Sequence, residues 1–252
     1  MIPLFVDWER VAHRLRSAPV IALFLDFDGT LSLLRPRPDQ ATLHDSLRPV
    51  LSALAHCPRF RLWVISGRRL EDVRARIHVR RIRYLGLHGW ETGAAHPLDH
   101  PTRALVPSLR NSVASALAES PGVWVEDKQY AFTVHYGQAS EADADRARTR
   151  LEEALAPHSR QFRIEPGHNV WEVLPREIGD KGRAVRRELA FLPDPAVPVY
   201  IGDDRVDEAA FAQLREGITI RVGRSRWSRA RYKLGGVAEV SAFLSRLREE
   251  FA

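Results

Sequence analysis

Two aspartates separated by one residue follow an apolar run near the N-terminus, in the stretch LFLDFDGTLSLL (residues 23–34). Alternate side chains of a strand share a face, so Asp26 and Asp28 would project to the same side. Two like charges held together need a cation, a proton or a ligand to compensate them. A divalent hard cation such as Mg²⁺, which prefers oxygen ligands, would do so. Because aspartate and glycine are also ordinary turn residues, the pair alone leaves both interpretations open.

A second acidic cluster, in VYIGDDRVDEAAF (residues 199–211), favours the metal interpretation. Asp203 would end an apolar strand, as Asp26 does. Asp204 and Asp207 also have a structural explanation, because they could cap the helix that follows and interact favourably with its dipole. Capping does not explain Asp203. Two strands that each end in a carboxylate therefore predict a divalent metal site.

Two further segments carry groups that suit a phosphate ligand. VISGRR ends a strand with Ser66 and Gly67, which offer a hydroxyl and backbone N–H groups to an anion, although this pair is also common without one. Lys181 begins a helix, where the dipole opposes a cation, so a phosphate or the acidic cluster should lie nearby. In an arginine-rich chain, Lys128 and Lys181 also stand out as sites that want a compact charge.

The elements that must position these groups alternate between strand and helix. Apolar runs predict strands at residues 20–27, 60–66, 83–89, 197–204 and 217–223. Helical patterns predict helices at residues 41–56, 69–77, 181–192, 207–216 and 237–251. This alternation predicts an α/β fold with a Rossmann-like, doubly wound parallel-sheet core and helices on both faces. Ligands of such sheets bind beyond the carboxyl ends of the strands.

The middle of the chain follows a different pattern. Its strand-like and helical pieces run strand–strand–helix–strand–strand, with the helix at residues 141–155. This order predicts a smaller inserted α+β cap domain at residues 97–175. The core would then consist of a first part at residues 1–96 and a second part at residues 176–252.

The composition is that of a soluble protein of enzyme size, with 252 residues, 44% hydrophobic and 28% charged. The single Cys57 excludes an internal disulfide and favours a reducing compartment. The N-terminus does not read as a secretory signal, and no apolar run is long enough to span a membrane. The net charge of +6 admits a nucleic-acid partner, but the basic residues are scattered between acids. We therefore expect a cytoplasmic monomer with neither a nucleic-acid nor a membrane partner.

Four motifs taken in order resemble the haloacid dehalogenase (HAD) superfamily of phosphatases. They are Asp-x-Asp-Gly-Thr from Asp26, Ser-Gly from Ser66, Lys-Gly from Lys181 and Gly-Asp-Asp-x-x-Asp from Gly202. The resemblance spans roughly residues 18–92 and 176–250, and it implies a phosphoaspartyl mechanism that uses Mg²⁺.

The resemblance also implies a role for each motif residue. Asp26 would be the nucleophile, and Asp28 would protonate the departing sugar oxygen and then deprotonate the hydrolytic water. Ser66 and Lys181 would bind phosphoryl oxygens. The Mg²⁺ ligands would be Asp26, the backbone carbonyl of Asp28 and Asp203, with Asp204 and Asp207 in support.

The cap resembles that of C2B-capped phosphatases, and among them the trehalose-6-phosphate phosphatases. The stretches that carry this resemblance are LGLHGWE, VEDKQYAFTVHY, VWEVLP and YIGDDRVDEAAF. The implied substrate-binding residues are Ser66, Gly67, Arg68, His88, Glu126, Lys128, His135 and Glu172. Where the family usually has arginine after His-Tyr, this chain has Gly137, and its last motif has Val206 in place of threonine. The missing arginine leaves the identity of the sugar open.

Several alternatives remain. Glu126 and Lys128 could form a solvated pair on one face of a strand, and His135 could make a structural hydrogen bond. Trp124 and Trp171 are expected in the cap core. The leading hypothesis is a Mg²⁺-dependent phosphatase acting on trehalose 6-phosphate. The alternatives are a phosphatase for glucosylglycerol, mannosylglycerate or sucrose phosphate, a regulatory domain that binds a sugar phosphate without hydrolysing it, and a nucleic-acid-binding module.

Overall fold

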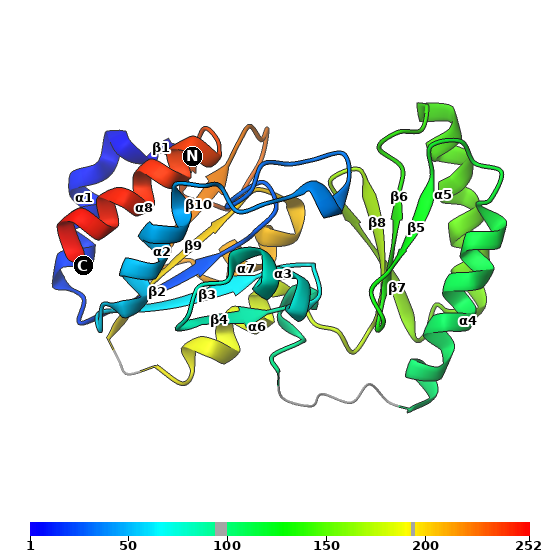
Figure 1. Ribbon diagram of the computed structural model, residues 1–252, viewed down its shortest axis with the longest axis horizontal. Helices are drawn as coiled ribbons and strands as arrows, with labels where there is room; N and C mark the ends of the chain where they lie inside the picture. The colour runs from blue at the N-terminus through cyan, green and yellow to red at the C-terminus, as the bar shows by residue number, and fades with distance from the viewer. Residues whose placement is uncertain (94–99, 193–194) are drawn as a thin grey trace. The chain divides into compact units, whose positions relative to one another are not determined.

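The structure is a computed structural model that describes residues 1–93, 100–192 and 195–252. The chain divides into a core unit, Met1–Ala94 together with Gly179–Ala252, and an inserted unit, Ala95–Ile178. The core unit is α/β and the inserted unit is α+β, so the fold class expected from the sequence is confirmed (Figure 1).

A seven-stranded parallel sheet forms the centre of the core unit. Its strands are, in spatial order, β1 (Ile2–Pro3), β11 (Tyr232–Leu234), β10 (Ile218–Val222), β9 (Ala196–Gly202), β2 (Val20–Leu25), β3 (Phe60–Ile65) and β4 (Ile82–Leu85). The chain moves from β2 outward to β3 and β4, and later returns to place β9 on the other side of β2. This reversal is the switch point of a doubly wound sheet, where ligands bind.

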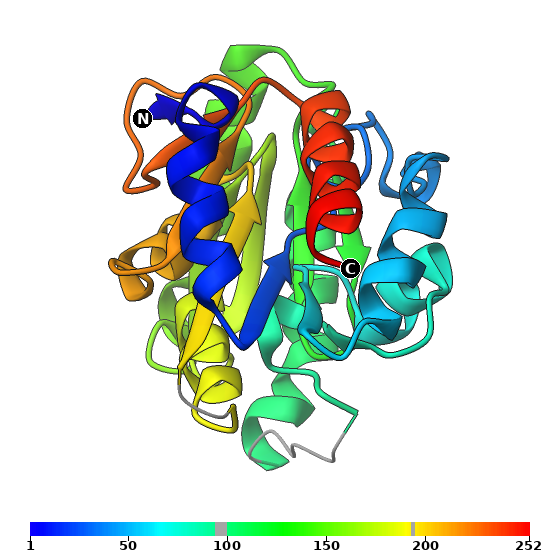
Figure 2. The same cartoon turned by 90° about the vertical axis from the view of Figure 1, so that its left-hand side faces the viewer.

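Alternate residues of the central strands pack into two separate hydrophobic layers. In β2, Leu23 and Leu25 contact one layer, whereas Ala22 and Phe24 contact the other. The first layer includes residues of α1 (Trp8–Ser17), α2 (Leu47–His56), α3 (Leu70–Ile77) and α8 (Val237–Phe251), two of which Figure 2 shows in dark blue (α1) and red (α8). The second layer includes residues of α6 (Lys181–Leu189) and α7 (Glu208–Gln213). Burial on both faces explains why these strands read as continuous apolar runs.

Several element boundaries differ from the sequence prediction; for example, the helix expected at residues 181–192 ends at Leu189. The helix expected from residue 41 begins at Leu47, which puts Pro49 in the first turn of α2, where its missing N–H costs nothing. The third strand ends at Leu85, because Leu87 and His88 adopt positive φ angles of 45° and 58°. The helix expected at residues 207–216 ends at Gln213. Within the described residues, we find no helix whose length and hydrophobicity would let it cross a bilayer.

The inserted unit contains a four-stranded antiparallel sheet. Its strands are β5 (Trp124–Asp127), β6 (Phe132–His135), β8 (Val170–Pro175) and β7 (Phe162–Gly167), in that spatial order. Helices α4 (His100–Ala116) and α5 (Glu141–Leu155) share a buried apolar cluster with residues of this sheet. The sequence pattern missed α4, in which Pro107 interrupts the helical signal.

Candidate active site

The carboxyl ends of β2, β3 and β9 gather three of the predicted site residues. Asp26 directly follows β2, Ser66 follows β3 and Asp203 follows β9. These ends are neighbours because β2 lies between the other two strands in the sheet. The backbone N–H of Asp26 donates to Ile201 O over 2.9 Å, which continues the ladder and fixes Asp26 beside β9.

Lys181 lies between two buried carboxylates. Its Nζ donates to Asp26 Oδ1 over 2.6 Å and to Asp207 Oδ1 over 2.7 Å. The lysine is only 2% exposed, so these contacts are shielded from water. Gly182 lets α6 approach α7 this closely, because a Cβ there would come 2.5 Å from Ala209 O. Carboxylates therefore supply the anions that the sequence required next to a lysine at a helix N-terminus.

Asp207 supports Lys181 and is itself fully hydrogen-bonded. Its Oδ1 also accepts from the Tyr200 hydroxyl over 2.7 Å, and its Oδ2 accepts from Asp204 N over 2.9 Å. Asp204 and Asp207 form a capping box at the short 3₁₀ helix Arg205–Asp207, so the structural explanation for them is also correct. Tyr200 is a site residue that the sequence interpretation missed. Its signal was one hydroxyl in an otherwise apolar strand.

Three carboxylates fit a divalent cation. Oxygens of Asp26, Asp203 and Asp207 lie within 4.8 Å of one another. Asp203 Oδ1 is buried and has no hydrogen-bond partner among the described residues, which is costly unless a cation compensates it. Gly29, with a φ of +77°, leaves the space for this side chain, since a Cβ there would come 2.1 Å from Asp203 Oδ2. An all-oxygen donor set of this kind suits Mg²⁺.

Burial dominates the electrostatics of this cluster. It raises the pKa of Asp26 to about 7, against the opposing charge of Lys181. Burial and the neighbouring Asp26 also raise the pKa of Asp203 well above its ordinary value. For Lys181, burial alone would lower the pKa, but the charges of Asp207 and Asp26 raise it well above the ordinary value. The lysine therefore stays cationic, and one cation does not balance three acids.

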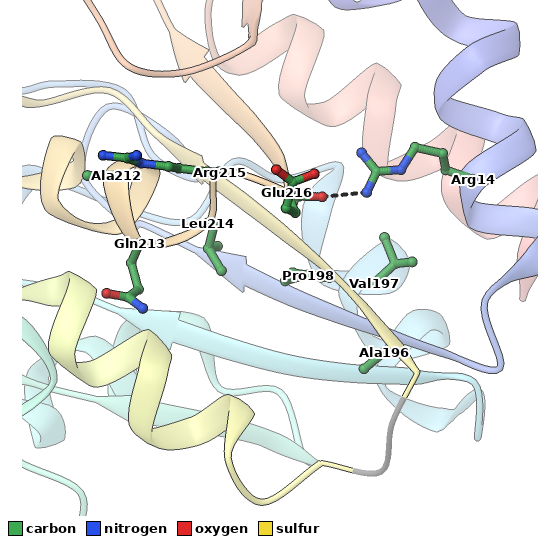
Figure 3. A pocket seen from close by; sticks show the side chains of 10 residues that line it. Arg14, Ala196, Val197, Pro198, Ala212, Gln213, Leu214, Arg215 and Glu216 are labelled. Carbon is green, nitrogen blue, oxygen red and sulfur yellow. Dashed lines mark hydrogen bonds between the residues drawn. The ribbon is translucent and has the colours of Figure 1, made fainter.

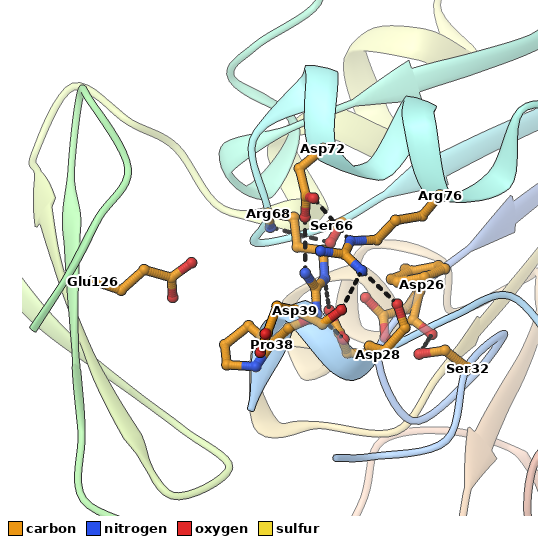
Figure 4. Close-up of polar contacts among 12 residues, drawn as sticks. Asp26, Asp28, Ser32, Pro38, Asp39, Ser66, Arg68, Asp72, Arg76 and Glu126 are labelled. Carbon is orange, nitrogen blue, oxygen red and sulfur yellow. Dashed lines mark hydrogen bonds and ion pairs between the residues drawn. The ribbon is translucent and has the colours of Figure 1, made fainter. Parts of the chain in front are cut away.

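Asp28 is held by Arg68. Arg68 Nε donates to Asp28 Oδ2 over 2.7 Å, and Nη2 donates to Oδ1 over 2.8 Å, so the contact is bidentate (Figure 4). The same guanidinium donates to Asp72 Oδ2 over 2.8 Å. Burial alone would lower the pKa of Arg68, but the hydrogen bonds to Asp28 and Asp72 raise it. Arg68, expected among the substrate-binding residues, thus contacts two carboxylates of the core unit.

The loop after β3 is hydrogen-bonded to the segment that follows β4. Ser66 is 1% exposed, and its Oγ accepts from Arg68 N over 3.1 Å. His88 N donates to Ser66 O over 2.9 Å, and Leu87 N donates to Arg68 O over 2.8 Å. The left-handed backbone at Leu87 and His88 makes these contacts possible. The structure therefore brings the Ser66-Gly67-Arg68 segment and the buried His88, which belong to two separate motifs, next to each other.

Glu91 caps α3 from outside the helix. The N-cap residue Arg69 makes no side-chain capping bond, and Glu91 Oε2 accepts from Leu70 N over 2.6 Å. Gly86 permits this approach, because a Cβ there would come 2.2 Å from Leu70 N. The segment after β4 thus fixes the start of the helix that follows the Ser66 loop.

The four predicted sugar-binding residues of the inserted unit lie on one face of its sheet. Register pairs Glu126 with Thr133 and Thr133 with Glu172, so these side chains form one cross-strand row. Lys128 Nζ donates to Glu172 Oε1 over 2.8 Å, and His135 Nε2 lies 2.8 Å from Glu126 Oε2. Lys128 with Glu172 and His135 with Glu126 are therefore cross-strand pairs. We call this surface the polar face; the intervening strand residues pack with α4 and α5.

The expectation that two tryptophans lie in the cap core is correct for Trp171 and wrong for Trp124. Trp171 is 8% exposed and belongs to the apolar cluster. Trp124 is 38% exposed and stacks on His135, with ring centroids 3.9 Å apart and planes 3° from parallel. Strand alternation explains the difference, because Trp124 shares its face with Glu126.

A cavity of about 450 Å³ lies at the other end of the core sheet (Figure 3). It is lined by residues at the start of β9, including Pro198, and by the segment before β10, where Arg14 of α1 donates to Glu216 O. Because doubly wound sheets bind ligands at the carboxyl ends of their strands, this cavity is not part of the candidate active site.

The doubly wound core and the inserted α+β unit, with acids at the ends of β2 and β9, define a HAD-like fold. The C-terminal domain of trehalose-6-phosphate phosphatase from C. albicans has the same fold, with a TM-score of 0.81, 20% sequence identity and coverage of 96% of both chains. The trehalose-phosphatase family model matches residues 24–234. The chain belongs to the trehalose-phosphatase family.

The chain is similar to two trehalose-phosphate phosphatases and to one protein with a different name. The trehalose-phosphate phosphatase of Mycobacterium marinum is 34% identical over 94% of this chain and 63% of its own length. Trehalose-phosphate phosphatase B of Arabidopsis thaliana is 32% identical over 91% of this chain and 66% of its own length. An uncharacterized glycosyl hydrolase of Mycobacterium tuberculosis is 37% identical over 90% of this chain, which spans only 18% of that protein. The chain thus spans less than two thirds of these relatives.

Proposed function

We propose that this protein is a Mg²⁺-dependent phosphatase that hydrolyses trehalose 6-phosphate to trehalose and phosphate. The observation that carries the proposal is the position of Lys181 Nζ, 2.6 Å from Asp26 Oδ1 at the strand ends where Asp203 has a buried, unpartnered oxygen. Membership of the trehalose-phosphatase family and the names of the relatives support the substrate.

In the first half-reaction, Asp26 attacks phosphorus and forms a phosphoaspartate while the bond to the sugar oxygen breaks. Lys181 and Ser66 bind phosphoryl oxygens and hold the group in line, which is most of what phosphoryl transfer requires. Asp26, Asp203 and the backbone carbonyl of Asp28 would hold Mg²⁺, with Asp204 and Asp207 in support. When bound, Mg²⁺ neutralises negative charge on the transferring phosphoryl group.

Asp28 handles the protons in both half-reactions. It gives a proton to the departing sugar oxygen, and as a carboxylate it then accepts a proton from the water that hydrolyses the phosphoaspartate. Both of its oxygens accept from Arg68 in this arrangement. One of these hydrogen bonds must therefore be exchanged for the sugar oxygen before Asp28 donates its proton.

The polar face of the inserted unit supplies the groups that recognise the sugar. Glu126, Lys128, His135 and Glu172 present carboxylates, an ammonium and an imidazole that can bind sugar hydroxyls. Gly137 favours a second candidate, a phosphatase for glucosylglycerol, mannosylglycerate or sucrose phosphate. The family arginine is absent there, and a Cβ at Gly137 would come 3.0 Å from Asn169 Cβ.

The test is phosphate release by the purified full chain from trehalose 6-phosphate and the three alternative esters, with Mg²⁺ and with EDTA. We expect the highest kcat/KM for trehalose 6-phosphate, and loss of activity on chelation. Asp26→Asn should abolish turnover, whereas the control Asp39→Asn should not, because that side chain is 66% exposed and pairs with Arg37.

Each other outcome has a defined meaning. A higher kcat/KM for another ester would select the second candidate. Binding of trehalose 6-phosphate without release of phosphate would favour a regulatory domain. Full activity of Asp26→Asn would reject the nucleophile assignment, and no phosphate from any sugar ester in the presence of Mg²⁺ would overturn the proposal.

A further inference from the structure

We infer that Asp72 and Arg76 of α3 are positioning residues, which hold Asp28 in place through Arg68. The inference rests on the proposed function, since it takes Asp28 to exchange protons with the substrate. All four side chains belong to the core unit and form one chain of alternating charges, drawn in Figure 4.

Asp72 links the two arginines. It lies in the first turn of α3, and Arg76 follows it by four residues on the same face of the helix. One carboxylate oxygen, Oδ2, accepts from Arg68 Nη1 over 2.8 Å, and the other, Oδ1, accepts from Arg76 Nε over 2.8 Å. Burial alone would raise the pKa of Asp72, but the hydrogen bonds from Arg76 and Arg68 lower it. Asp72 is therefore a carboxylate with both oxygens in use.

Arg68 transmits this placement to Asp28. Its side chain is 10% exposed, and its guanidinium also donates from Nη2 to Pro38 O over 2.9 Å and lies 5.4 Å from the Phe27 ring centroid. A planar guanidinium bound on several sides has one orientation, and a bidentate carboxylate must align with it. The position of Asp72 thus determines where the Asp28 carboxylate lies.

Arg76 anchors the far end of the chain to the backbone. Its Nη1 donates to Asp39 O over 3.2 Å and to Ala41 O over 2.6 Å. Together with the contact from Arg68 to Pro38 O, these bonds tie α3 to the segment that follows the Asp28 loop. An ordinary exposed i,i+4 pair would be worth only about 0.3–0.5 kcal/mol and would have no such attachments.

The chemistry provides a selective readout. A sugar oxygen is a poor leaving group and needs a proton from Asp28, whereas p-nitrophenolate leaves without one. Misplacing Asp28 should therefore slow formation of the phosphoaspartate far more from a sugar ester than from p-nitrophenyl phosphate. The value of kcat/KM reports this step, because the later attack of water, which Asp28 also assists, is common to both esters. A merely structural defect would slow both reactions alike.

The experiment measures kcat and KM for trehalose 6-phosphate and p-nitrophenyl phosphate with full-length wild type and Asp72→Asn, in Mg²⁺. We expect kcat/KM for the sugar ester to fall on the order of tenfold, which is part of the 10²–10⁴ typical of a general acid. The fall in kcat/KM for the aryl ester should be less than about twofold. Glu71→Gln is the matched control, because that side chain is 85% exposed and its ion pair within the described residues is a long 4.0 Å contact with Arg69.

A second variant set tests whether the effect passes through Arg68. In an Arg68→Ala background, Asp72→Asn should cause no further loss, because its partner is gone. Arg76→Lys should retain more of the kcat/KM for the sugar ester, relative to that for the aryl ester, than Arg76→Ala does. With an active wild type, three results would overturn this inference without touching the proposed function. They are equal losses on both esters, no loss on either ester, or additive effects of Arg68→Ala and Asp72→Asn. A wild type inactive on both esters would overturn the proposed function and this inference with it.

Discussion

Lys181 Nζ donates to Asp26 Oδ1 over 2.6 Å, although 155 positions separate the two residues in the chain. Asp207 Oδ1 lies 2.7 Å from the same nitrogen, and the lysine is almost completely buried. The pairing explains how a cation is kept at the strand ends without a substrate. It also means that the lysine has a structural role as well as the proposed role in phosphate binding.

Replacing this lysine should therefore affect both stability and activity. Lys181→Met leaves two buried carboxylates without their cation, and loss of one partner of a buried pair typically costs about 3–5 kcal/mol. We expect a lower Tm at neutral pH and a fall in kcat/KM on the order of 10², as for the loss of one transition-state donor. Calorimetry and phosphate release measure the two effects. Lys233→Met, at an exposed position of β11, is the control and should change neither.

Gly29→Ala should weaken metal binding by displacing Asp203. The added Cβ would come 2.1 Å from Asp203 Oδ2, at a residue whose φ is +77°. Gly223→Ala is a matched control, because its φ of +76° imposes the same backbone strain while no described residue beyond its chain neighbours lies within 4 Å of the added Cβ. Titration with Mg²⁺ should show a weaker Kd for Gly29→Ala alone. Equal Kd values for the two variants would contradict this assignment of Asp203.

Stability of the metal-free protein should depend on the protonation of Asp26. The folded-state pKa of about 7 lies above the ordinary value of 3.8, so the folded state binds this proton more tightly than the unfolded chain. The free energy of unfolding should therefore fall as pH rises from about 4 to about 7. Asp26→Asn should flatten this profile and raise Tm at pH above 7, by about 2–4 °C for each kcal/mol recovered. Urea unfolding in EDTA at a series of pH values measures the free energy of unfolding. An Asp26→Asn variant whose free energy of unfolding depends on pH as steeply as that of the wild type would contradict the prediction.

The two tryptophans of the inserted unit should behave differently when truncated. Trp171→Ala removes a buried ring and should lower stability by about 3–5 kcal/mol. Trp124→Ala removes a half-exposed ring from the polar face, so stability should change by less than about 1 kcal/mol. Because this ring orients His135, KM for trehalose 6-phosphate should rise, while p-nitrophenyl phosphate should be hydrolysed as before. A stability loss at Trp124 as large as that at Trp171 would contradict the role assigned to the polar face.

The central sheet and its acids could be predicted because each depends on local pattern. Apolar runs marked the strands, and Asp26 and Asp203 each stood at the end of one of them. Parallel strands bring such ends together whatever the loops do. The pairing of Lys181 followed from the unfavourable position of a lysine at a helix N-terminus.

The remaining features depend on tertiary structure. The bidentate contact of Arg68 with Asp28 depends on the direction that the long Arg68 side chain takes past Asp72. The spacing of these residues in the sequence does not reveal that direction. Tyr200 belongs to the site because its hydroxyl donates a hydrogen bond to Asp207. Trp124 was assigned to the core because a large aromatic ring favours burial, but strand alternation determined its face.

Glu91 gives the core a further property. It caps α3, and the backbone groups of Gly86 and Glu91 bond to each other, before the chain leaves the core unit after Ala94. The start of α3 is thereby stabilised by residues of the core unit itself, and this contact does not depend on the sequence of the inserted unit. A different insert grafted between Ala94 and Gly179 would therefore leave the start of α3 capped. If the proposed function is correct, the reaction chemistry and the sugar preference could be engineered independently of each other.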